Sequence, residues 1–183
     1  MSRIENVSKD ELDARQQKLY DEIMRDRPRP QLSGPFSIWI NTPGIAEPSN
    51  ALANFFRHQC KLDQRLVELI ILTVCRDANA KYAWSAHEPL ARKAGLTPET
   101  IGAIRNRKQP DFKQDDEKLI YDLVRELLTT KSLSAASFDR AIAMLGRDRL
   151  IEAVSCAGMY CQVGFVVNAF DIPTNPGGDV LPD

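Results

Sequence analysis

One histidine and one glutamate in this sequence could perform acid–base chemistry if the fold brings them together. His87 is one of only two histidines and lies in the segment ANAKYAWSAHEPLARKAG, residues 78–95. On a helix Ala80, Ala83 and His87 share one stripe, because they are spaced by three and four residues. These small side chains leave room for a ligand beside the imidazole. A core histidine that bonds a backbone carbonyl or Glu68 would give the same pattern, so both interpretations stay open.

Glu68 lies in a segment whose side chains are otherwise almost all apolar from Leu66 to Cys75. Burial of a lone carboxylate is costly, so Glu68 must be paired, protonated or facing a pocket. Arg65 lies one turn earlier on the same predicted helix and is the structural partner that the spacing offers. Without a full partner, Glu68 would be available as a general acid or base.

Three further side chains are candidates for contact with a substrate. Trp84 and Tyr82 lie beside the stripe that carries His87 and could wall a pocket. Arg57 could bind a substrate carboxylate through two hydrogen bonds, although most arginines face solvent. Its neighbour His58, taken alone, is weak evidence for a functional site.

The sequence lacks the motifs of several other chemistries. It has no glycine-rich phosphate loop, no nucleophile elbow and no H-E-x-x-H segment. Two histidines cannot form a three-histidine metal site, and none of the four cysteines forms a C-x-x-C pair. We therefore predict no metal and no cofactor. The cysteine pattern is typical of a reduced, cytoplasmic protein.

Length, charge and hydropathy limit the partners that we expect. The 183 residues suit one domain, and a net charge of -1 gives no strong attraction to nucleic acid or to an anionic membrane. The N-terminal MSRIENVSKDELDARQQ has no apolar core and so does not resemble a secretory signal. Residues 150–170 are long and mostly apolar, but Glu152, Ser155, Gln162 and Asn168 would be costly in lipid. We expect a buried or subunit-interface helix there, and a small molecule as the partner.

Helical signals dominate the chain, and no convincing alternating strand pattern is present. Predicted helical segments cover residues 8–27, short pieces within 36–59, and then 63–80, 83–95, 97–106, 114–131, 134–146 and 147–170. Ser8, Asp63 and Thr97 are the predicted N-caps. We predict an all-α, single compact domain of about eight helices. Its N-terminal helix and linker occupy 1–35, its core 36–172 and an extended or loosely ordered tail 173–183.

The residues around Glu68 and His87 resemble the carboxymuconolactone decarboxylase family, which includes the alkylhydroperoxidase D-like proteins. Glu68 in ELIILTVCRDANAKYAWSAH is followed 19 residues later by His87 and then by PLARKAGL. The likeness extends to PFSIWINTPGIAEPSNALANFFRHQCKLDQRL upstream and GMYCQVGFVVNAFDIP downstream, and so covers most of the chain. It implies an all-helical fold that forms homo-oligomers, trimers or hexamers, with the site near a subunit interface. Gly158 and Gly164 fit such an interface.

The peroxidase branch of that family carries a C-x-x-C pair whose second cysteine lies four residues before the histidine. In this chain those two positions are Ala80 and Ala83, whereas Glu68 and His87 are present. The thiolate is the nucleophile in dithiol peroxidase chemistry. We therefore predict that dithiol peroxidase activity is lost.

The decarboxylase branch needs no cysteine pair and acts on a small carboxylated lactone, so the resemblance implies a lyase or isomerase. His87 would be the proton shuttle, and Glu68 would orient or charge it. Many members without the cysteine pair carry a further glutamate beside the tryptophan, where this chain has Lys81 and Ala83, so we expect a divergent substrate. The alternatives are a redox protein that uses Cys75 or another lone cysteine, and a non-catalytic oligomeric binding protein.

Overall fold

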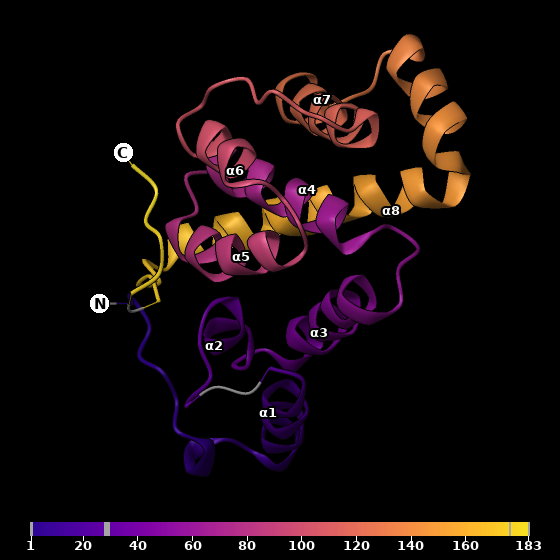
Figure 1. The fold of residues 1–183 in the computed structure, drawn as a ribbon. Helices are drawn as coiled ribbons and strands as arrows, with labels where there is room; N and C mark the ends of the chain where they lie inside the picture. The colour runs from indigo at the N-terminus through magenta and orange to yellow at the C-terminus, as the bar shows by residue number, and fades with distance from the viewer. Residues whose placement is uncertain (1, 28–29, 176, 183) are drawn as a thin grey trace.

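The computed structural model describes residues 2–27, 30–175 and 177–182, and the regular structure in these residues is entirely helical (Figure 1). A short 3-10 helix, η1 (Lys9–Glu11), precedes the α-helices. These are α1 (Ala14–Asp26), α2 (Pro35–Trp39), α3 (Pro43–His58), α4 (Gln64–Asp77), α5 (Lys81–Lys93), α6 (Pro98–Arg105), α7 (Asp115–Thr130) and α8 (Ala135–Ala169). The predicted all-α class and single compact domain are confirmed.

The core forms around α4, which is buried on all sides. Every residue from Leu66 to Arg76 is buried. α5, α7 and α8 all pack against this helix, which explains why its sequence is apolar around almost its whole circumference. In Figure 1, α4 and α8 cross the middle of the molecule, and α1, α2 and α3 form a group below them.

The first α-helix begins later than predicted. Ser8 caps only η1, and Leu12 is extended, with φ of -80° and ψ of 148°. Asp13 then forms a capping box with Gln16, in which each side chain accepts a hydrogen bond from the backbone N–H of the other residue. A capping box satisfies N–H groups that have no partner within the helix, so α1 starts at Ala14.

α8 is divided at Gly146, in agreement with the two helical segments predicted on either side of this glycine. Gly146 has φ of 76° and ψ of 168°, which lie outside the helical region and are rarely adopted by residues with a side chain. Figure 1 shows the sharp turn that results between the two halves of the helix.

Within the described ranges, α8 is the one helix long and apolar enough to cross a membrane by length and composition. Half of its most apolar stretch is buried inside the protein. The buried carboxylate of Glu152 accepts hydrogen bonds from the backbone N–H groups of Lys61 and Leu62. These contacts are those of a helix packed into the core, which agrees with the first of the two alternatives that we expected for residues 150–170, a buried or a subunit-interface helix.

The described residues of the C-terminal tail, 173–175 and 177–182, have no regular structure but pack on α5 and α6. Asp179 accepts a hydrogen bond from the indole Nε1 of Trp84 at 2.9 Å and forms an ion pair with Arg105 at 3.2 Å. Leu181 is buried. These contacts hold the tail against the domain.

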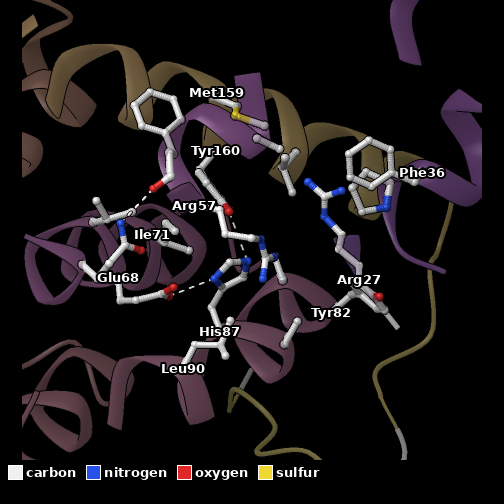
Figure 2. Close-up of a pocket in the computed structure, with 18 of the residues that line it drawn as sticks. Arg27, Phe36, Arg57, Glu68, Ile71, Tyr82, His87, Leu90, Met159 and Tyr160 are labelled. Atoms are coloured by element: carbon white, nitrogen blue, oxygen red, sulfur yellow. Dashed lines mark hydrogen bonds and ion pairs between the residues drawn. The ribbon is translucent and has the colours of Figure 1, made fainter. Parts of the chain in front are cut away.

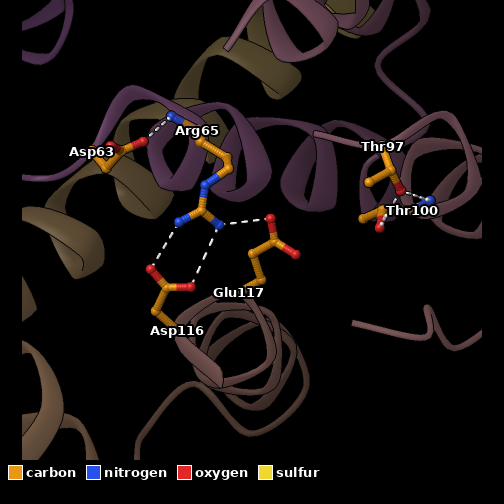
Figure 3. A network of polar contacts seen from close by, with 6 residues as sticks. All are labelled: Asp63, Arg65, Thr97, Thr100, Asp116 and Glu117. Atoms are coloured by element: carbon orange, nitrogen blue, oxygen red, sulfur yellow. Dashed lines mark hydrogen bonds and ion pairs between the residues drawn. The ribbon is translucent and has the colours of Figure 1, made fainter. Parts of the chain in front are cut away.

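Two predicted N-caps are confirmed at the starts of α4 and α6 (Figure 3). Oδ1 of Asp63 accepts a hydrogen bond from the backbone N–H of Arg65 at 2.8 Å, and Oγ1 of Thr97 accepts one from Thr100 at 3.1 Å. Each cap satisfies an N–H group that has no partner within its own helix.

Arg65 links α4 to α7 (Figure 3). Its Nη2 lies 2.8 Å from Oδ2 of Asp116, and its Nη1 lies 2.6 Å from Oε1 of Glu117. The side chain of Glu117 is only 4% exposed, so its charge depends on Arg65 for compensation. The arrangement in which Arg65 pairs with Glu68 is not observed, because Arg65 is engaged by two carboxylates of another helix.

Replacement of Arg65 by methionine should lower the free energy of unfolding by about 3 kcal/mol, because it leaves an uncompensated charge on the buried Glu117. Urea denaturation followed by circular dichroism measures this change. The matched control is Arg15→Met, which breaks the exposed Arg15–Glu47 ion pair and should have a much smaller effect. Equal losses in the two variants would contradict the role assigned to Arg65.

Candidate active site

α4 and α5 hold Glu68 and His87 against each other (Figure 2). Oε2 of Glu68 lies 2.9 Å from Nδ1 of His87, and the two side chains are 9% and 15% exposed. The turn between the helices contains Asn79, whose φ of 50° is a left-handed conformation that asparagine tolerates. This short turn folds α5 back onto α4, so residues 19 positions apart come into contact.

Tyr160 of α8 completes a chain of three polar groups (Figure 2). Its hydroxyl lies 3.1 Å from Nε2 of His87, and the two rings meet edge to face with centroids 5.1 Å apart. Burial raises the pKa of the Tyr160 phenol well above its ordinary value, and the negative charge of Glu68 raises it further, whereas Arg57 acts in the opposite direction. The phenol is therefore protonated at neutral pH, and both imidazole nitrogens have a partner.

Tyr160 was not among the predicted site residues. It lies 73 positions from His87, so no local spacing connects the two. The available signal was a tyrosine within a mostly apolar helix, because a buried tyrosine hydroxyl usually has a hydrogen-bond partner. That signal predicts that a partner exists but does not identify it.

A cavity of about 400 Å³ lies beside these three groups (Figure 2). Most of its wall is apolar and comes from the side chains of Phe36, Trp39, Phe56, Ile71, Met159 and Val163. Because these residues belong to α2, α3, α4 and α8, the cavity lies where the N-terminal helices meet the core. Its size and lining suit a small molecule with an apolar body.

Cationic side chains outnumber acidic ones at this cavity. Glu68 is the one acidic side chain among the described residues that line it, whereas Arg27, Arg57 and Lys93 all reach it. Arg57 and Lys93 are exposed, and neither forms an ion pair within the part of the chain that the structure describes. Arg27 is buried and donates to the side-chain oxygens of two asparagines of α3. The cavity therefore favours an anionic group near its exposed side.

Tyr82, predicted to wall a pocket, lies in the wall of this cavity. Its hydroxyl is 2.9 Å from Oγ of Ser33. Gly34 packs against the same ring, since a Cβ at this position would lie 2.4 Å from Cε1 of Tyr82, and its φ of 69° also favours glycine. The loop before α2 thus holds the Tyr82 ring in place.

Trp84 does not line the cavity, contrary to the prediction that it would form a wall. It is fully buried elsewhere, where its indole donates to Asp179 of the tail. Tyr82 and Trp84 are two residues apart and so point roughly 200° from each other around the helix, which prevents both from facing one cavity. Ala80 and Ala83 stand at the positions of the expected peroxidase-branch cysteines; Ala83 lines the cavity and Ala80 is buried outside it.

This arrangement has the groups that acid–base chemistry requires. As a carboxylate, Glu68 can only accept a hydrogen bond, so it accepts the Nδ1–H of His87 and fixes the tautomer of the imidazole. Nε2 is then an acceptor that faces the Tyr160 hydroxyl. In residues 2–27, 30–175 and 177–182, no group of three or more His, Cys, Asp or Glu side chains could hold a metal ion.

A family model matches the segment that carries most of this site. Residues 45–113 match the carboxymuconolactone decarboxylase family. The matched segment includes Arg57, Glu68 and His87, whereas Phe36 and Tyr160 lie outside it. A comparison with curated proteins finds no match.

Solved structures share the fold over nearly the whole chain. A peroxidase-related protein from Silicibacter sp. TM1040 superposes with a TM-score of 0.77 at 13% identity, covering 95% of this chain and 92% of that chain. A peroxidase-related protein with an alkylhydroperoxidase AhpD core, from Ralstonia eutropha JMP134, gives a TM-score of 0.78 at 13% identity and the same coverage.

A third structure covers less of this chain. It is the protein of unknown function ATU0492 from Agrobacterium tumefaciens, related by name to the antioxidant defence protein AhpD. Its TM-score is 0.65 at 17% identity, and the match covers 75% of this chain and 95% of that chain. The chain thus shares the fold of these alkylhydroperoxidase-related structures, and its residues 45–113 match the model of the carboxymuconolactone decarboxylase family.

Proposed function

We propose that the protein is a cofactor-independent lyase or isomerase that moves protons on a small carboxylated lactone or a related aromatic-derived compound. The observation that carries this proposal is the contact between Glu68 and His87 beside a cavity with room for a substrate. The same pair enclosed without a cavity would instead suit a non-catalytic binding protein.

His87 is the proton shuttle in this proposal. When Nε2 of the neutral imidazole takes up a proton, the ring becomes an imidazolium, and the adjacent carboxylate of Glu68 stabilises its positive charge. When the proton returns to the substrate, the imidazole is neutral again, and Glu68 still holds it by Nδ1–H. Glu68 therefore both orients the imidazole of His87 and stabilises its charged form.

The cavity supports a substrate with one charged end and one apolar end. The exposed guanidinium of Arg57 can bind a carboxylate in bidentate fashion. Tyr82 and the other ring side chains of the wall would contact the body of the substrate. Lys81 and Ala83 replace the glutamate that many family members carry near this site, which supports a substrate different from carboxymuconolactone itself.

The peroxidase-related neighbours suggest a second candidate function, thiol-based reduction of peroxides. The alanines at positions 80 and 83 argue against it, because the site lacks the two thiols that this chemistry uses. The cysteines that are present are free, and burial raises the pKa of each thiol: Cys60, Cys75, Cys156 and Cys161. A thiol with a raised pKa is protonated at neutral pH and is a poor nucleophile.

Assembly into trimers or hexamers in the cytoplasm is part of the same proposal. One face of α8 is apolar and exposed: Ile151 is 58% exposed, Val154 37% and Phe165 72%. Gly158 lies on the same face and would allow close approach of a second helix. Contact between copies along this face would cover these side chains.

Replacement of His87 by glutamine should lower kcat about 100-fold or more, because the proton shuttle is lost, and Glu68→Gln should lower it as well. The measurement is release of carbon dioxide and product from carboxymuconolactone and related lactones. His58→Gln is the matched control, since it removes the other histidine and should leave turnover unchanged. Full activity in both His87→Gln and Glu68→Gln would contradict the proposal. Binding of lactone without turnover by the unaltered protein would favour the binding-protein alternative.

Replacement of Arg57 by glutamine should raise KM about 10-fold and leave kcat nearly unchanged, because it removes the charge-assisted hydrogen bonds to the substrate carboxylate. The same turnover assay over a range of substrate concentrations measures both constants. Lys108→Gln, which removes an exposed cation outside the cavity, is the control. An unchanged KM in Arg57→Gln would contradict this role.

Iodoacetamide at pH 8 should fail to alkylate Cys75 and Cys156 in the native protein, because their raised pKa keeps both thiols protonated and burial keeps them inaccessible. Both should react after unfolding in guanidinium. Peptide mass spectrometry of alkylated cysteines measures the outcome. Rapid native alkylation of Cys75 together with alkylation-sensitive peroxide consumption would favour the redox alternative.

A further inference from the structure

We propose that the hydroxyl of Tyr160, rather than an imidazole nitrogen, exchanges the proton with the substrate. His87 accepts the proton that Tyr160 gives up. This inference rests on the proposed acid–base function and names a further catalytic residue for it. It follows from the hydrogen bonds of His87 and from the position of Tyr160 in the cavity wall.

Both nitrogens of His87 are engaged by protein groups. Nδ1 lies 2.9 Å from Oε2 of Glu68, and Nε2 lies 3.1 Å from the hydroxyl oxygen of Tyr160. Since the carboxylate of Glu68 can only accept, Nδ1 of the neutral imidazole carries the hydrogen and Nε2 is an acceptor. The phenol therefore donates its O–H to Nε2, and no ring nitrogen is left for a substrate.

The oxygen of Tyr160 retains accepting capacity for a ligand. Tyr160 lines the cavity together with His87 and Arg57, and its O–H hydrogen is directed to His87. A hydroxyl oxygen has two acceptor lone pairs besides its hydrogen. The positive charge of Arg57 acts on the same phenol. A carboxylate bound at Arg57 would thus place its neighbouring atoms close to the Tyr160 oxygen.

Transfer of one proton from substrate to Tyr160 and of another from Tyr160 to His87 in the same step, called the relay below, avoids the need for a free phenolate. Burial and the charge of Glu68 raise the pKa of Tyr160, so a phenolate standing alone would be unfavourable here. If the phenol gives its proton to Nε2 in the same step in which it receives one, the tyrosine stays neutral. The positive charge then forms on His87, next to the carboxylate that stabilises it.

In this relay two bonds break and two bonds form. A C–H bond of the substrate next to a carbonyl group breaks, and its proton forms a new O–H bond with Tyr160. The original O–H bond of Tyr160 breaks, and that proton forms the Nε2–H bond of His87. The electron pair of the C–H bond stays on the substrate as a carbanion delocalised into the carbonyl group. The reverse transfer, to another carbon of the substrate, restores the neutral relay and completes an isomerisation.

Acetylation by 4-nitrophenyl acetate tests this relay in the whole protein without any lactone. When the ester carbonyl enters the cavity, the Tyr160 oxygen attacks it and its proton moves to Nε2 of His87. An O–acetyl bond forms, and 4-nitrophenolate leaves. Four tyrosines are present in the chain, so peptide mass spectrometry after an acid quench compares Tyr160 with three internal references.

We expect Tyr160 to be acetylated at least about 10-fold faster than the other tyrosines, and this rate to fall about 100-fold in His87→Gln, because the base is lost. Tyr160→Phe, which keeps the ring contact with His87, should abolish the fast release of 4-nitrophenolate. Tyr121→Phe is the matched control, since Tyr121 packs against Phe112 outside the cavity and its loss should leave the release unchanged.

Three results would overturn the relay: acetyl groups on His87 instead of Tyr160, equal acetylation of Tyr160 with and without His87, or no preferential acetylation of Tyr160. The first result would mean that the imidazole itself meets the substrate. Because the probe needs no lactone turnover, a failed relay is distinguishable from a failed lyase or isomerase function. Fast acetylation of Tyr160 in a protein inactive on lactones would keep the relay and remove the proposed reaction.

Discussion

The carboxylate of Glu68, buried within the central helix of the fold, is the constraint on which the site depends. α4 is surrounded by α5, α7 and α8, so this carboxylate is largely removed from bulk water and needs a partner inside the protein. His87 is that partner, and the contact fixes which face α5 presents to α4. Tyr160 then ties α8 to the same point. One buried charge thus aligns three helices, and the cavity lies beside their junction.

The separation of the charged groups on α4 keeps Glu68 available to His87. Arg65 lies one turn away from Glu68 on the same helix, yet its guanidinium is held by the two carboxylates of α7. A structural ion pair therefore lies on one side of α4 and the Glu68–His87 pair on another. If Arg65 turned towards Glu68, the buried Glu117 would lose its compensation, so the α4–α7 contact also stabilises the arrangement of the site.

The sequence correctly predicted the helical class, the break at Gly146 and the caps at Asp63 and Thr97, because each depends on local backbone preferences. It also pointed to Glu68 and His87, which a short turn brings together. The remaining site could not be predicted in this way. Tyr160 reaches His87 through long-range packing, and the Trp84 indole finds its partner, Asp179, 95 positions away in the tail. The wall contributed by α2 depends on how the N-terminal helices pack on the core.

We propose that Glu68, His87 and Tyr160 together form an acid–base site in which a carboxylated substrate binds. A crystal structure of the protein soaked with small carboxylated lactones or their stable analogues would test this proposal. The account predicts that the ligand fills the cavity, with its carboxylate on Arg57 and a reacting atom within hydrogen-bond reach of the Tyr160 oxygen. A ligand bound elsewhere, or a cavity closed by protein side chains, would contradict the account.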